Sequence, residues 1–223
     1  MTGKMPLRIV CISDTHGHHD KLEIPDGDIL IHAGDISGRG GRSEIDQFNE
    51  WIGRLPHKHK VVIAGNHDFA LEKINSQTAK FMLSNTVYLR DSGVEIEGIR
   101  IWGSPWQPCF LGWAFNLPRG AALKEKWDLI PTGVDILVTH GPPQGILDLT
   151  SRGAREGCEE LLLALERVRP KIHLFGHIHE ARGAMNLNGT LCINASNAAP
   201  WYMTWHPPIV LRTDGKSVDI VGL

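Results

Sequence analysis

Five short apolar segments of this 223-residue chain each end in side chains that can bind a metal ion. Short apolar runs bounded by turn residues are typical of buried strands in a parallel sheet. The carboxyl ends of parallel strands lie at one edge of the sheet, where open α/β sheets bind ligands. We therefore expect an α/β fold in which these ends converge on one site. The segments are Asp14-Thr15-His16-Gly17, Gly34-Asp35, Gly65-Asn66-His67-Asp68, His140-Gly141-Pro142-Pro143 and Gly176-His177-Ile178-His179.

The remaining pattern alternates strands and helices in the first half and is rich in strands in the second. Alternation predicts a parallel core sheet, and the second half is expected to add antiparallel strands. Ser43 is expected to cap the first helix, whose apolar positions recur at helical spacing. We expect one domain over residues 1–223. The predicted helices cover 43–55, 76–83 and 158–168, and the predicted strands cover 7–12, 29–33, 60–64, 87–89, 94–96, 99–102, 135–139, 173–175, 185–187, 191–194, 209–213 and 217–221.

Charge and hydropathy exclude several classes of protein. The formal net charge is −2, from 23 basic and 25 acidic residues, so a nucleic-acid partner is not expected. The chain has no apolar run near the roughly 20 residues of a membrane span, so no membrane partner is expected. The first residues do not resemble a secretory leader, and we expect a cytoplasmic protein.

Seven side chains at the strand ends form a set too large for one tetrahedral metal site. Shared between two ions, with Asp35 bridging, they would give each ion about four protein ligands. Mixed oxygen and nitrogen ligands suit manganese, iron, zinc or nickel, so the identity of the two divalent metals stays open. Two ions about 4 Å apart can clamp a phosphoryl group. The seven are Asp14, His16, Asp35, Asn66, His140, His177 and His179.

The five motifs, in this order, resemble those of the calcineurin-like metallophosphoesterase superfamily. The resemblance covers nearly the whole chain. The Asn194-Ala195-Ser196 segment and Pro207-Pro208-Ile209-Val210 look most like the small metallophosphoesterase-domain-containing (MPPED) group. The resemblance implies an α/β/β/α sandwich, in which mixed sheets flanked by helices carry the site at one edge.

The resemblance also implies a role for each motif residue. Asp14, His16 and His179 would hold the first metal, and Asn66, His140 and His177 the second, with Asp35 bridging the two ions. His67 would lie beside the pair without binding either ion, and would stabilise the transition state or protonate the leaving oxygen. The reaction implied is in-line attack of a metal-bound hydroxide on phosphorus, with no covalent intermediate.

Position 38 departs from the family pattern. Many members have a Gly-Asp-x-x-Asp motif whose second Asp orients the histidine equivalent to His67, but this chain has Gly38 there. Asp68 is the nearest carboxylate in sequence that could take its place. Arg39 matches an arginine that protein-phosphatase relatives use to bind phosphate, although it could equally be a solvated loop residue.

The substrate class follows only from the resemblance. We expect a small-molecule phosphoester or nucleotide, and favour phosphodiesters, cyclic nucleotides in particular. The aromatic loop at 103–120 either packs on the core or forms an apolar wall at which Trp106 and Trp113 contact a base. One alternative is a phosphomonoesterase or protein phosphatase, for which Arg39 speaks. Another is a nucleotide-binding module with low turnover, which the presence of both His177 and His179 disfavours.

Overall fold

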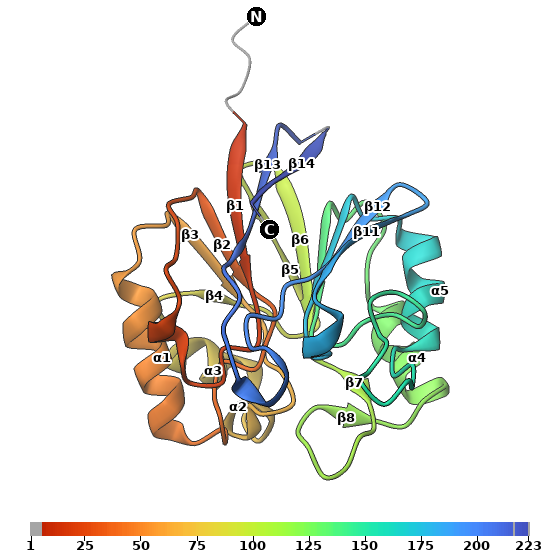
Figure 1. Ribbon diagram of the computed structural model, residues 1–223, viewed down its shortest axis with the longest axis horizontal. Coiled ribbons are helices and arrows are strands. Elements are labelled where there is room, and N and C mark those ends of the chain that lie inside the picture. Colours follow the sequence, from red (N-terminus) through yellow and green to blue (C-terminus); the bar gives the residue numbers. More distant parts are fainter. Residues whose placement is uncertain (1–5, 216, 223) are drawn as a thin grey trace, which may run out of the picture.

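Two six-stranded β-sheets pack face to face in the computed structural model, which describes residues 6–215 and 217–222 (Figure 1). The ends of the expected domain, residues 1–5 and 223, and residue 216 lie outside the described residues. The first sheet has β1 to β4 in parallel, with β13 antiparallel to β1. Its order is β14 (Val218–Gly222), β13 (Ile209–Thr213), β1 (Leu7–Ile12), β2 (Ile29–His32), β3 (His59–Val62) and β4 (Val87–Tyr88).

The second sheet has four parallel strands between two antiparallel edge strands. The expectation of antiparallel additions in the second half is therefore only partly right: β11, β13 and β14 are antiparallel, whereas β9, β10 and β12 pair in parallel. The order is β11 (Gly183–Leu187), β12 (Thr190–Asn194), β10 (Ile172–Phe175), β9 (Ile136–Thr139), β6 (Ile99–Ser104) and β5 (Ser92–Ile96).

Helices cover the outer face of each sheet (Figure 1). The inner faces form one apolar core that includes Ile9, Ile31, Ile101 and Val138. The first sheet carries α1 (Arg42–Arg54), α2 (Phe69–Glu72) and α3 (Ser76–Met82), and the second carries α4 (Ala121–Asp128) and α5 (Glu159–Val168). The α/β/β/α sandwich expected from the resemblance is confirmed.

Helix α1 confirms the buried face predicted from spacing, because Ile45, Phe48, Trp51 and Ile52 are all buried. Its start differs from the expectation. Gly41 is the N-cap, and its N–H donates to the Glu44 carboxylate at 2.9 Å. Ser43 lies inside the first turn, and its hydroxyl accepts from the Gln47 side chain.

Short elements escape the sequence prediction. The loop at 103–120 contains β7 (Gln107–Pro108) and β8 (Asn116–Leu117), which pair in parallel, and α4 follows it. Three single turns of 3-10 helix, η1 (His19–Lys21), η2 (His179–Ala181) and η3 (Pro200–Tyr202), lie in the connections. Within the described part of the chain, no helix is both long and apolar enough to cross a membrane.

The carboxyl ends of β1, β2, β3, β9 and β10 meet at the lower end of the molecule in Figure 1. The motifs follow these five ends directly. The topology therefore brings residues from 14 to 179 to one place, at the junction of the two sheets.

Candidate metal centre

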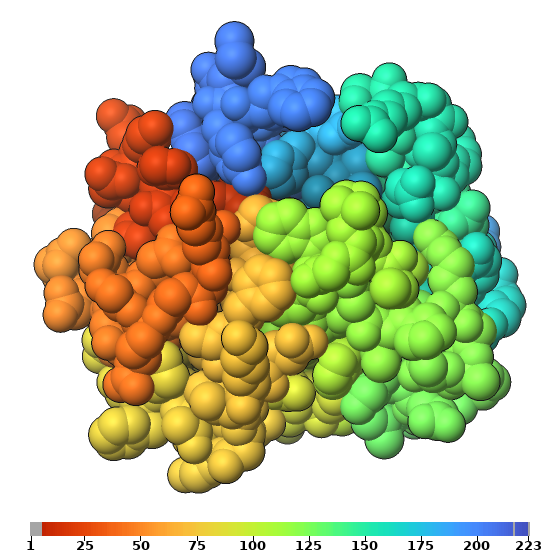
Figure 2. Space-filling model, turned by 90° about the horizontal axis from the view of Figure 1, so that it is seen from below, coloured from red at the N-terminus to blue at the C-terminus, as the bar shows by residue number. Residues whose placement is uncertain are grey.

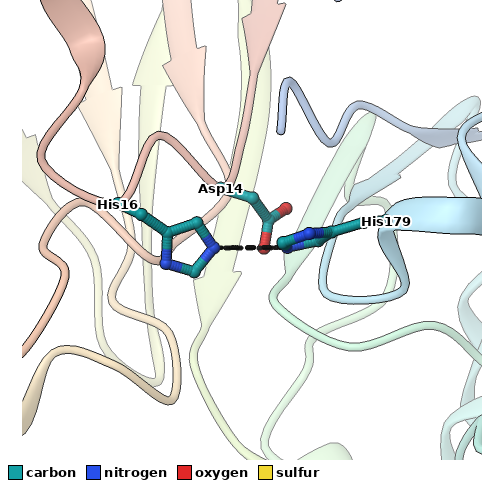
Figure 3. Close-up of side chains that lie close together, drawn as sticks. All are labelled: Asp14, His16 and His179. Carbon is teal, nitrogen blue, oxygen red and sulfur yellow. Dashed lines mark hydrogen bonds and ion pairs between the residues drawn. The ribbon is translucent and has the colours of Figure 1, made fainter. Parts of the chain in front are cut away.

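The first cluster joins the end of β1 to the turn after β10. Asp14 is fully buried, and its Oδ1 lies 3.4 Å from His179 Nε2 (Figure 3). His16 Nε2 lies 3.2 Å from His179 Nε2 and 3.9 Å from Asp14 Oδ1. Ser196 holds the carboxylate from behind, since its hydroxyl donates to Asp14 Oδ2 at 2.8 Å. One carboxylate and two imidazoles thus place their ligand atoms within 4.8 Å of one another.

The second cluster is built around the buried ring of His140. Its Nδ1–H donates to the Ala33 carbonyl at 2.9 Å, which leaves the lone pair of neutral imidazole on Nε2. This Nε2 faces Asn66 Oδ1 at 2.9 Å and Asp35 Oδ2 at 3.4 Å. Once this Nε2 has lost its proton, three electron-pair donors converge here, and a cation between them would stabilise the arrangement. The backbone hydrogen bond on the opposite ring nitrogen is typical of metal-binding histidines. The donor set therefore fits a divalent metal.

Asp35 connects the two clusters. Its Oδ2 lies 3.7 Å from His16 Nε2, in addition to its contact with His140, and its Oδ1 accepts from the His67 backbone N–H at 2.8 Å. It also belongs to two of the carboxylate–histidine groups with ligand atoms close enough to share an ion. A carboxylate in this position faces both clusters at once.

His177 lies at the side of the second cluster. Its ring centroid is 5.0 Å from that of His140, and its backbone N–H donates to Asp14 Oδ2 at 3.0 Å. Its ring nitrogens do not belong to any of the close carboxylate–histidine groups among the described residues. The structure thus brings six of the seven predicted ligands into direct contact through their side chains, and places His177 next to them.

Charge in the site favours cations. Burial raises the pKa of Asp14 and Asp35, but the neighbouring histidines outweigh it and hold both values well below the usual range. Burial lowers the pKa of His140, but Asp35 outweighs it and raises the value to about 9. His16, by contrast, has its pKa lowered by burial to about 4. Two ionised carboxylates in a desolvated position give the site a strong affinity for positive charge.

His67 is oriented by a backbone group. Its Nδ1–H donates to the Gly38 carbonyl at 2.6 Å, and its ring stacks on Trp113 at 4.2 Å between centroids and 27° between planes. Asp68 does not replace the missing carboxylate, since its oxygens accept from the backbone N–H groups of Gly65, Ile36 and Ser37. The ring of His67 also lies near His16 and Asp35, within reach of a shared ion.

Two clefts open beside the candidate metal ligands. Figure 2 shows the molecule from below the view of Figure 1, which is the end at which the motif loops lie. One, of about 480 Å³, is lined by His177, His179, Phe110, Leu111 and Trp201 among others. The other, of about 510 Å³, is lined by His16, Tyr202 and Arg39 among others.

Not every residue singled out in the sequence lies in these clefts. Trp106 packs half-buried against the core, where its Nε1–H donates to Asp91 at 2.8 Å and Lys126 lies over its ring, and it lines neither cleft. Trp113 contacts His67. Tyr202 was not expected at the site from the sequence, but its ring packs against His16 at 5.0 Å and His179 at 5.9 Å between centroids. Tyr202 belongs to no motif, and the sequence signal that could have indicated it is the run of aromatic residues in its irregular segment.

A four-layer sandwich whose strand ends gather carboxylates, an amide and imidazoles defines a metallophosphoesterase. The sequence model of the calcineurin-like phosphoesterase family matches residues 7–181, so the chain belongs to this family. This confirms the resemblance found in the motifs. Members of this family typically bind two divalent metals, and candidate ligands are present here.

Relatives support the same assignment. Metallophosphoesterase domain-containing protein 1 of Homo sapiens is 48% identical over 228 residues, covering 92% of this chain and 70% of the relative. A protein of Synechococcus named probable cyclic nucleotide phosphodiesterase is 24% identical over 159 residues, covering 69% of this chain and 58% of its own. A solved structure from Thermus thermophilus shares the fold, with a TM-score of 0.62 at 12% identity over 97% of this chain and 99% of its own.

Proposed function

We propose that the chain is a metal-dependent phosphodiesterase that hydrolyses small diesters, with cyclic nucleotides among its substrates. The observation that carries the proposal is the convergence of ligand atoms on Asp35 beside a cleft with apolar walls. The name of the Synechococcus relative supports the same substrate class.

The residues divide into two sets that would each hold one divalent ion. Asp14, His16 and His179 form one set, Asn66, His140 and His177 the other, with Asp35 between them. Such ions, when bound, neutralise phosphoryl oxygens and lower the pKa of water. The Ala33 carbonyl accepts from His140 Nδ1–H, so Nε2 is the ring nitrogen that would bind an ion after losing its proton, and Ser196 fixes the Asp14 carboxylate, so both groups are positioned in advance.

His67 is the candidate proton donor. Its Nδ1–H donates to the Gly38 carbonyl, so Nε2 is the atom available to deliver a proton to the leaving oxygen. Trp113 stacks on one face of the ring and restricts its rotation. A backbone carbonyl and an aromatic face thus orient His67, whereas a carboxylate orients the equivalent histidine in many relatives.

The charge around the centre bears on the choice between diester and monoester. A monoester dianion is bound best by an added cationic clamp, ideally a bidentate arginine. Arg119 is engaged by Glu159 and the Gly157 carbonyl. Arg39 is exposed, lines the cleft on the His16 side and is the observation that favours a phosphomonoesterase as second candidate.

Turnover of paired substrates tests the proposal. We expect kcat/KM with Mn²⁺ to be higher for bis(p-nitrophenyl) phosphate than for p-nitrophenyl phosphate, and higher for adenosine 3′,5′-cyclic monophosphate than for AMP. Preference for both monoesters, lost in Arg39→Ala, would establish the second candidate instead. Nucleotide binding without turnover of any of the four would identify a binding module. Asp35→Asn protein, prepared in parallel, controls for contaminating phosphatases.

A further inference from the structure

Two segments far apart in sequence bring large apolar side chains to the mouth of the 480 Å³ cleft. Phe110 and Leu111 belong to the loop between β7 and β8, and Trp201 belongs to η3. Trp201 is 80% exposed and Leu111 is 76% exposed. Large apolar groups left in water at the rim of a cleft often mark a place where a ligand covers them.

The backbone of both segments is held in an unusual conformation. Leu111 has φ +50°, Trp201 +60° and Tyr202 +57°, all in the left-handed region that bulky residues rarely adopt. Such conformations persist where surrounding structure imposes them, and they gather at ligand-binding segments. Tyr202, the neighbour of Trp201, packs against His16 and His179, and Phe110 lies 6.3 Å from His177 between ring centroids. Each segment is therefore tied to the candidate metal ligands.

We infer that Phe110 and Trp201 form a binding site for the planar base of a nucleotide substrate, a proposal that rests on the proposed function. The phosphodiester lies at the metal ligands, and the base extends into the cleft between the two aromatic side chains. Base–aromatic stacking tolerates any base, since each presents a π-face.

The polar part of the cleft lining favours a base over an alkyl chain. Ser151 and Arg152 line the cleft with a hydroxyl and a guanidinium group, and the carboxylate of Glu156 lies 3.7 Å from Arg119. The polar edge of a base can hydrogen-bond with the hydroxyl and guanidinium groups, whereas an alkyl chain offers them no partner. The volume also lies in the range of about 300–1,000 Å³ found for small-molecule sites.

The test compares a substrate with a base and one without. The pair is adenosine 3′,5′-cyclic monophosphate and the methyl riboside of the same cyclic phosphate, in which a methoxy group replaces the base. We expect Trp201→Ala and Phe110→Ala each to raise KM for the nucleotide by about 5- to 100-fold, with kcat changed by less than about twofold. KM for the methyl riboside should stay unchanged. Trp201→Phe should keep most of the affinity, and Phe81→Ala, on the exposed face of α3, is the matched control.

A second measurement separates this inference from the proposed function. AMP binding to chelator-treated protein, followed by calorimetry, needs no turnover. If the wild type hydrolyses neither substrate but Trp201→Ala weakens AMP binding, the base site stands and the phosphodiesterase proposal fails. If the nucleotide is hydrolysed and the alanine variants raise KM equally for both substrates, or for neither, the base site is refuted while the phosphodiesterase proposal stands.

Discussion

Asp35 uses both oxygens of its carboxylate in different directions. Oδ2 faces His16 and His140, one from each cluster, and Oδ1 accepts from the backbone of His67. A charge in this position acts on both predicted ions, whereas each histidine faces one. The residue is also nearly inaccessible, at 2% exposure, so solvent cannot replace a lost charge.

We expect Asp35→Asn to lower kcat on bis(p-nitrophenyl) phosphate by at least about 100-fold, because loss of the shared charge weakens both metal sites. Steady-state kinetics and elemental analysis of the same samples measure the effect. Asp46→Asn is the control, since Asp46 forms an exposed ion pair with Arg42 on α1. Should Asp35→Asn turn over as fast as His16→Asn, the bridging position is wrong.

His67→Ala should keep its metal content and lose turnover, at the lower end of about 10²- to 10⁴-fold. The loss should grow as the leaving group becomes more basic, because proton donation then matters more. A series of substituted aryl diesters measures this slope, with His59→Ala as the control, since His59 is a half-buried histidine at the start of β3, paired with Glu97. A fall in metal content would instead place His67 among the ligands, as its closeness to His16 and Asp35 allows.

At the scale of elements, the turns that follow the strands depend on glycines, which let the backbone lie close to the candidate metal ligands. A Cβ added at Gly65, after β3, would lie 2.5 Å from the Asp35 backbone nitrogen and 2.6 Å from His140 Cε1. Both neighbours are buried, so neither can move away without shifting the centre.

We therefore expect Gly65→Ala to destabilise the protein by about 1–3 kcal/mol through overpacking. It should also lower kcat by about 100-fold, the cost of a misplacement of about 1 Å. Urea unfolding and kinetics measure the two effects. Gly222→Ala in β14 is the control, since its added Cβ would meet Val210 at an ordinary 3.7 Å. Unchanged kcat in Gly65→Ala would refute the requirement for close approach.

Apolar runs predicted the long strands to within one or two residues, and most clearly the central strands β2, β9 and β10, which are buried along their whole length and therefore almost continuously hydrophobic. Other elements were beyond this signal. Helix α4 buries only Leu123 and Trp127, four positions apart, and its remaining residues carry no apolar periodicity. The N-cap of α1 depends on where the Glu44 carboxylate folds back, which composition does not specify.

At the scale of the molecule, the motifs predicted which side chains gather, because ligand chemistry and strand ends are both visible in sequence. They did not predict the support around them. The Gly38 carbonyl that holds His67 has no side-chain signature. Trp106 and Trp201 are the same residue type, yet one packs against the core and the other is exposed at the cleft, and only tertiary contacts distinguish them.

Metal binding should stabilise the whole fold, since the clusters join both sheets. Mn²⁺ at about 100 times its dissociation constant should add about 2.7 kcal/mol per site. At about 2–4 °C per kcal/mol for a chain of this size, Tm should rise by roughly 5–10 °C for one site. Scanning calorimetry of chelator-treated protein with and without Mn²⁺ measures this rise, with Ca²⁺ as a control ion. Elemental analysis of the Mn²⁺-loaded protein counts the ions, and a stoichiometry that never exceeds one metal per chain would contradict the proposal of two metal sites.

Residues of the segment between β12 and β13, which are synthesised late, hold candidate metal ligands that are synthesised first. All seven predicted ligands precede residue 180, yet the Asp14 carboxylate is held by Ser196, and the Ser13 N–H donates to Asn197 Oδ1 at 3.0 Å. Strand β1 also lacks one neighbour until β13 pairs with it. A nascent chain that has emerged from the ribosome as far as His179 therefore carries every predicted ligand but lacks Ser196, Asn197 and β13, which hold Asp14 and β1 in place. We expect the predicted metal sites to form only once these last segments have been made.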